Sequence, residues 1–125
     1  MKVFRTAVWL QGMYILFTAL WPILHIQSFL AVTGPKTDIW LVKTVAALLI
    51  PIALCLLSYT VIQTNRLPGI LLGATTSIAF IIVDFHYALN NVISEIYMLD
   101  GLVEAGFLLL WAYLWFGRRG DWINA

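Results

Sequence analysis

A small set of ionisable and amide side chains interrupts long apolar stretches of the sequence. The set is His25, Lys43, Asp84, Asn91, Asp100 and Glu104. A charged residue near the centre of a membrane-spanning helix costs about 2.5–3.5 kcal/mol, and it usually faces the inside of a helix bundle and pairs there. The acids of this set outnumber its one lysine. We therefore expect the extra carboxyl group to be protonated or to pair with His25 as a cation.

Such a carboxyl group can take up and release a proton near neutral pH, which defines the chemistry open to it. This property suits a proton-coupled transporter or an enzyme that moves a proton on a membrane-soluble substrate. In the enzyme, Asp84 or Glu104 would act as the base and His25 as the acid. The structural alternative is that Lys43 pairs with one of the acids and fixes the register of the helices. The sequence does not choose between these, and catalytic residues stay unassigned.

Motifs for other chemistry are absent from the sequence. It contains no HExxH, CxxC, GxSxG or P-loop pattern. Helical spacing turns His86 away from Asp84, so we expect no metal site and no cofactor. The one cysteine, Cys55, cannot form a disulfide within the chain, and we interpret it as a small hydrophobic residue.

The composition defines the class of protein that must position these groups. Of the 125 residues, 62% are hydrophobic and 10% are charged, and the formal net charge is +1. Ordinary soluble domains are about 45–50% apolar and about 25% charged, so the composition excludes a soluble globule and a disordered chain. The small net charge also argues against a nucleic-acid partner. A polytopic membrane protein is the class that fits, and its first partner is the lipid bilayer.

Four apolar segments are long enough to cross a bilayer, which takes about 20 helical residues. They cover about 7–26, 39–62, 69–90 and 96–116. Backbone groups in lipid must be paired within their own segment, so each segment is predicted to be a helix, and short connections make consecutive helices antiparallel neighbours. The sequence therefore predicts an all-α, antiparallel four-helix transmembrane bundle, a single domain over 1–125 with a loop at 27–38.

Basic residues at the segment ends predict the orientation of this bundle. Five lie on one side, namely Lys2, Arg5, Arg66, Arg118 and Arg119. Lys36 lies on the other side. Because basic residues are retained on the cytoplasmic side, both termini are predicted to be cytoplasmic, in the cell (inner) membrane.

Helical spacing predicts which side chains share a face, because positions three and four apart line up. Each segment then has one stripe with its polar members toward the outer side. The first three stripes include Gln11, Tyr14, Thr18, Trp21 and His25; Lys43, Ala47, Ile50 and Leu54; and Gly69, Gly73, Ser77, Asp84, Tyr87 and Asn91. The fourth includes Asp100, Glu104 and Trp111. If all four stripes point inward, they form an outward-facing site of His25, Lys43, Asp84, Tyr87, Asn91, Asp100 and Glu104.

Small residues and two outlying polar residues complete this prediction. Gly69, Gly73 and Ser77 allow close helix packing, so the inner end should be tight and the outer end open, unless the glycine face is a dimer interface. His86 and Asn90 lie on the opposite side of their helix from Asp84. We expect them to reach lipid headgroups or to contact another copy or another subunit.

One segment carries a resemblance to other proteins. Residues Leu20–Val42 resemble a segment of uncharacterised small four-helix bacterial membrane proteins. The residues that carry it are Leu20, Trp21, Pro22, His25, Ser28, Phe29, the run 32–38, and Trp40, Leu41 and Val42. The resemblance implies a defined outer loop and no activity. Three functions stay open: binding or transport of a small ligand or protons, an accessory subunit in a homo-oligomer or larger membrane complex, and an enzyme for a lipid-like substrate.

Overall fold

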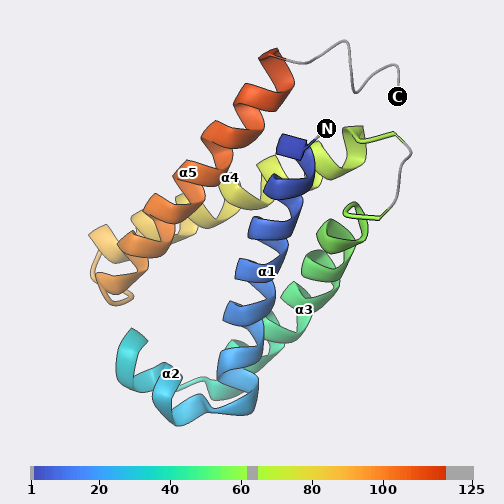
Figure 1. The fold of residues 1–125 in the computed structure, drawn as a ribbon. Helices are drawn as coiled ribbons and strands as arrows, with labels where there is room; N and C mark the ends of the chain where they lie inside the picture. Colours follow the sequence, from blue (N-terminus) through green and yellow to red (C-terminus); the bar gives the residue numbers. More distant parts are fainter. Residues whose placement is uncertain (1, 62–64, 118–125) are drawn as a thin grey trace.

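The chain is all-helical in its computed structural model, which describes residues 2–61 and 65–117. Five helices follow one another (Figure 1): α1 (Lys2–Leu24), α2 (Ile26–Thr33), α3 (Ile39–Ser58), α4 (Leu67–Leu89) and α5 (Ile96–Gly117). Four of them, α1, α3, α4 and α5, are long and apolar enough to cross a membrane. The all-helical class and the four candidate spans agree with the sequence. Arg118 and Arg119, which contributed to the predicted orientation, lie outside the described residues.

Helix α2 lies in the segment that the sequence analysis predicts to be a loop. Helix α1 ends at Leu24, and His25 begins α2 as its N-cap, with the imidazole Nδ1 accepting a hydrogen bond from the Ser28 backbone N–H at 3.2 Å. Gly34, with φ of 101°, ends α2, and its N–H donates to the Leu30 carbonyl. A positive φ suits glycine because it has no Cβ. Eight residues are too few for hydrophobic periodicity to stand out, which is why the helix was missed.

The long helices pack as two pairs. Helix α1 packs along α3, and α4 packs along α5, whereas the contacts between the pairs are sparser. In Figure 1 the pairs lie close together near the start of α1 and diverge toward the opposite end. There α2 contacts both α1 and α5. The arrangement therefore has one end where four helices meet and one end where a short fifth helix lies between the pairs.

The end near the start of α1 is filled by side chains, and we name its core the packed half. This core consists of Phe4, Ala7, Val8, Ile15, Ala53, Leu56, Ile70, Trp111 and Leu114. Gly73 makes its closest approach possible, because a Cβ there would lie 2.4 Å from the Trp111 indole. A Cβ added at Gly69 would likewise lie 3.2 Å from the rings of Phe4 and Tyr59. The glycine face is thus covered inside the chain.

A buried amide joins three helices in the packed half. The Gln11 side chain is fully buried, and its Nε2 donates to the Gly73 carbonyl at 3.1 Å and to Ser77 Oγ at 2.9 Å. Its Oε1 accepts a hydrogen bond from Trp111 Nε1 at 2.7 Å. Both polar atoms of the amide therefore have partners, as buried polar groups in folded proteins nearly always do.

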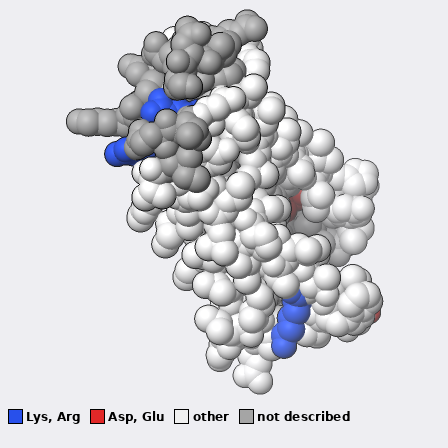
Figure 2. Space-filling view, turned by 90° about the vertical axis from the view of Figure 1, so that its right-hand side faces the viewer, with Lys and Arg blue, Asp and Glu red and all other residues white. Residues whose placement is uncertain are grey.

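The outer surface of the long helices is apolar. Phe17, Leu48 and Leu109 are 69%, 64% and 72% exposed, on α1, α3 and α5 respectively. Figure 2 shows one face of the molecule with basic side chains at its two ends and a nearly uncharged band between them. Within this band, acidic atoms are visible at the bottom of a recess. Such a surface suits contact with lipid rather than with water.

Candidate functional site

A cavity of about 520 Å³ lies at the end where the helix pairs diverge, lined by residues of all five helices. We name the cavity and its lining residues the hollow half. Most of its walls are apolar, including Ala46, Leu49, Phe80, Val103 and Ile15, which also borders the packed half. Small-molecule sites are typically about 300–1,000 Å³, mostly apolar, with a few placed polar groups. The size and the walls of this cavity fall within that description.

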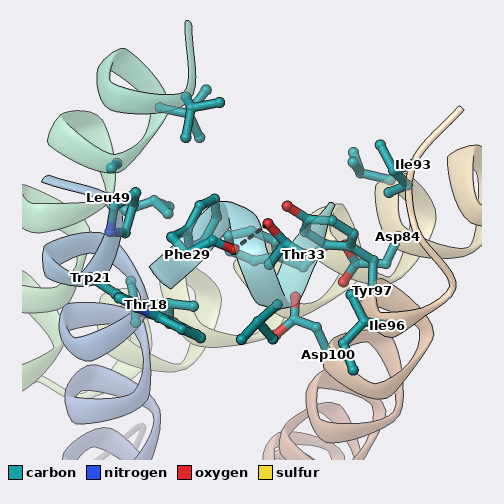
Figure 3. A pocket seen from close by; sticks show the side chains of 18 of the residues that line it. Thr18, Trp21, Phe29, Thr33, Leu49, Asp84, Ile93, Ile96, Tyr97 and Asp100 are labelled. Carbon is teal, nitrogen blue, oxygen red and sulfur yellow. Dashed lines mark hydrogen bonds between the residues drawn. The ribbon is translucent and has the colours of Figure 1, made fainter. Parts of the chain in front are cut away.

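Three carboxyl side chains line the cavity. Asp84 comes from α4, and Asp100 and Glu104 come from successive turns of α5. Asp84 is 3% exposed and Glu104 is 1% exposed. Asp84 and Asp100 reach the cavity from two neighbouring helices, α4 and α5 (Figure 3). Of the residues of the predicted site, the structure brings Asp84, Asp100 and Glu104 to one cavity.

Two oxygens of these carboxyl groups have no hydrogen-bond partner. Among the described residues, Asp84 Oδ2 and Glu104 Oε2 are the buried side-chain polar atoms left unpaired. Leaving a buried polar atom unpaired costs about 1–3 kcal/mol, and more when the group is charged. Both residues line the cavity. The unpaired oxygens therefore belong to side chains of the cavity wall.

Two polar side chains of α1 support the acids. The Tyr14 hydroxyl donates a hydrogen bond to Asp100 Oδ1, and the Thr18 hydroxyl donates to the Tyr14 carbonyl. Both residues line the cavity. The sequence analysis assigns them to the polar stripe of the first segment but leaves them out of the predicted site. Their position on that stripe, one turn apart, was the signal that could have included them.

A lysine stands at the edge of the cavity between two aromatic rings. Lys36 Nζ lies 5.2 Å from the ring centroids of both Phe29 and Tyr97. It also donates to Thr33 Oγ1 at 2.8 Å and to the Gly34 carbonyl at 3.2 Å. Figure 3 shows Phe29, Thr33 and Tyr97 on the cavity wall. The sequence analysis missed this group because it treated 27–38 as a loop.

His25 does not belong to the cavity. The side chain is exposed, and its ring contacts Ser28, with Nδ1 2.6 Å from Ser28 Oγ. The expectation that His25 extends the stripe of the first segment is wrong, because α1 ends one residue before it. The break in the helix changes the direction of the side chain.

Lys43 is also away from the predicted cluster. It is exposed on α3, whereas the cavity is lined on that helix by residues such as Val42, Ala46 and Leu49. The packed face of α3 contains Ala46 and Ala53, both buried. Small side chains allow neighbouring helices to approach, so they determine which face of α3 turns inward. The stripe through Lys43 was therefore displaced from the true inward face.

The polar residues at the end of α4 do not line the cavity either. Tyr87 and Asn91 are exposed: the Tyr87 ring packs edge-on against His86 at 5.0 Å, and Asn91 has φ of 59° just after the helix. Asn tolerates this left-handed conformation better than most residues. His86 and Asn90 are exposed as well, and Asn90 Nδ2 donates to the His86 carbonyl at 2.6 Å.

The acids of the cavity are not accompanied by a metal-binding set. Within residues 2–61 and 65–117, no group of three or more His, Cys, Asp or Glu side chains could hold a metal ion. Comparisons with protein-family models, curated proteins and solved structures found no match to the chain. The cavity and the acids that line it are therefore the features from which a function can be inferred.

Proposed function

We propose that the chain is a small protein of the cell (inner) membrane that binds a small ligand in the cavity of the hollow half. In this proposal the four long helices form an antiparallel transmembrane bundle, and the cavity opens toward the outer side. The observation that carries the proposal is the pair of unpartnered oxygens, Asp84 Oδ2 and Glu104 Oε2, on buried residues of a largely apolar cavity. A ligand group with two or more hydrogen-bond donors could pair both oxygens.

The distribution of basic residues along the sequence, five toward one side against Lys36 and Lys43 toward the other, supports the orientation. Arg66 lies 5.3 Å from the ring centroid of Phe4, a residue of the packed half, and Arg5 follows Phe4 on α1. Both arginines therefore lie at the end of the molecule that contains the packed half. Lys36 lies at the other end, beside the cavity. Basic residues concentrate on the cytoplasmic side of membrane proteins. The packed half would then be cytoplasmic, with both termini, and the hollow half would face outward.

A ligand site explains the cavity better than a purely structural role does. A buried polar group that holds helices together is hydrogen-bonded, as the Gln11 amide is. Unpaired buried oxygens weaken the fold instead of strengthening it. The carboxyl groups of the hollow half are therefore better suited to a partner from outside the chain.

A proton is the second candidate occupant of this site. The carboxyl groups of Asp84 and Asp100 line the same cavity on neighbouring helices, and Tyr14 donates a hydrogen bond to Asp100. Neighbouring carboxyl groups can hold one proton between them, as proton relays in membrane proteins do. This arrangement favours proton uptake either alone or linked to ligand binding.

Access to the cavity tests the proposal through single-cysteine labelling. The chain has one cysteine, so Cys55→Ser gives a background without thiols. In that background, Thr18→Cys adds a thiol in the cavity, and Ala53→Cys adds one in the packed half as the matched control. We expect a small, charged, membrane-impermeant thiosulfonate reagent to label Thr18→Cys in cells from the outside and to leave Ala53→Cys unlabelled.

Two results would contradict the proposal. If the Thr18→Cys thiol reacts only after the protein is unfolded, the cavity is closed to ligands. If it reacts only from the cytoplasmic side in inverted vesicles, the orientation is the reverse of the one proposed.

A further inference from the structure

We infer that the ligand of this cavity is a lipophilic cation, a small molecule with an apolar body and one ammonium group. The inference rests on the proposed function and adds the chemical class of the ligand. It is carried by three features of the cavity: its unpaired acidic oxygens, its apolar walls and the aromatic rings at its edge.

The charges that line the cavity favour a cation. Three carboxyl groups and one ammonium group, that of Lys36, line the cavity. The Lys36 ammonium already donates hydrogen bonds to Thr33 Oγ1 and the Gly34 carbonyl. Among the described residues, no donor pairs with Asp84 Oδ2 or Glu104 Oε2. An ammonium group has up to three N–H donors and no acceptor, so it complements two free carboxyl oxygens. An anion would meet acids that outnumber the lysine, and a neutral apolar molecule would leave both oxygens unpaired.

The rest of the wall requires the ligand to be largely apolar. Around the acids, the cavity is lined by side chains without hydrogen-bonding groups, such as Pro22, Leu49, Phe80 and Ile93. A hydrated inorganic cation would lose its water against these side chains without gaining oxygen ligands from them. A hydrocarbon or aryl body attached to the ammonium group would instead bury apolar surface there.

The edge of the cavity already holds an ammonium group. Lys36 Nζ stands 5.2 Å from the centroids of the Phe29 and Tyr97 rings. Aromatic faces attract cations, and sets of aromatic rings are a recurrent way to recognise amines. Both rings line the cavity together with the carboxyl groups. The wall of the cavity therefore includes aromatic rings of the kind that bind ammonium groups.

Three probes of the same shape test the charge of the ligand. They are 4-phenylbutylamine, 4-phenylbutan-1-ol and 4-phenylbutyrate, which differ at one end as cation, neutral group and anion. Each is added to the purified Cys55→Ser, Thr18→Cys protein in lipid nanodiscs, and protection of the thiol from the thiosulfonate reagent is measured. We expect half-protection by the amine at a concentration at least tenfold below that of the alcohol or the butyrate.

Matched carboxyl variants then separate binding at the site from partition into lipid. Replacing the two unpaired acids together, Asp84→Asn with Glu104→Gln, should raise the amine concentration for half-protection at least tenfold. The matched control Glu95→Gln changes an exposed carboxyl outside the cavity lining, and it should leave the protection unchanged. Size-exclusion chromatography checks that each variant is folded. If the double variant does not fold, the ranking of the three probes on the unchanged acids still decides.

The outcomes distinguish this inference from the proposed function. Equal protection by amine and alcohol, or stronger protection by butyrate, overturns the cationic class while the cavity is still a ligand site. Protection by Mg²⁺ or Ca²⁺ at low millimolar concentration, without effect of the amine, overturns it in favour of a metal ion. A Thr18→Cys thiol that never reacts in the folded protein removes the proposed function itself.

Discussion

The packed half and the hollow half are built from the same four long helices, yet they treat buried polar groups in opposite ways. In the packed half, both polar atoms of the Gln11 amide have partners, and the Trp111 indole N–H is one of these partners. In the hollow half, Asp84 and Glu104 are almost as fully buried, but each keeps one oxygen unpaired. Glu104 lies next to Gln11 and Ser77. A fully paired polar group and a partly unpaired one therefore occur on neighbouring side chains.

The difference separates what holds the fold from what is available for function. Pairing of a buried polar group returns the free energy lost when it leaves water, whereas an unpaired group lowers stability. The packed half therefore stabilises the molecule, and the hollow half contributes less stability per buried residue. Stability measurements on matched variants in the two halves can break or sharpen this comparison.

The largest effect is expected for tryptophan removal in the packed half. Trp111 is 1% exposed, lies against Gly73 and hydrogen-bonds Gln11. Trp111→Ala should lower the free energy of unfolding by about 3–5 kcal/mol. Trp21 is half-buried beside the cavity, and Trp21→Ala should cost clearly less. Equilibrium unfolding of both variants in detergent micelles, followed by circular dichroism, measures the difference; equal losses would mean that the two halves are packed alike.

A smaller effect is expected when a side chain is enlarged. Ala53 and Ala46 lie two turns apart on the same face of α3, and both are buried. Ala53→Leu adds volume to a filled core and should destabilise the protein by about 1–3 kcal/mol. Ala46→Leu extends into the cavity, so its stability should change little, while protection by 4-phenylbutylamine weakens. The comparison is contradicted if Ala46→Leu destabilises the protein as much as Ala53→Leu.

The smallest effect is expected for the lysine at the edge of the cavity. Lys36→Met removes an ammonium from the Phe29 and Tyr97 rings and should lower the free energy of unfolding by about 0.5–1 kcal/mol. Lys43→Met is the matched control, because Lys43 is exposed and does not line the cavity. Thermal unfolding of the two variants in the same detergent provides the measurement. If Lys43→Met lowers the free energy of unfolding more than Lys36→Met does, the placement of Lys43 outside the site is contradicted.

Composition and segment length were enough to predict the coarse fold. Apolar stretches of membrane-spanning length must pair their own backbone groups, which leaves few alternatives to helices. The helices differ from the predicted spans at their ends: α1 begins at Lys2, and α3 ends at Ser58, while the predicted end of the second span, Ile62, lies outside the described residues. Helix α2 was missed because its eight residues carry too little pattern.

The candidate site was predictable only where the helix itself determines the direction of a side chain. Asp100 and Glu104 are four residues apart on α5, so they share a face whatever the packing. His25 and Asn91 lie just beyond helix ends, where helical spacing no longer applies. Lys43 failed for another reason: α3 is apolar on all sides, so a lone lysine was a poor marker of its inward face. A lysine can extend along an apolar surface and keep its charge outside.

The hydrogen-bond partners of the Gln11 amide are synthesised long after Gln11 itself. Its partners Gly73 and Ser77 follow it by 62 and 66 residues, and Trp111 follows it by 100. Because α1 is translated first, it would enter the membrane before α4 and α5 in the proposed bundle. The Gln11 amide would then lack its full set of partners until α5 has been added. A chain truncated before α5 would therefore lack the Trp111 partner of this amide, and incompletely folded chains are the ones that cellular proteases remove.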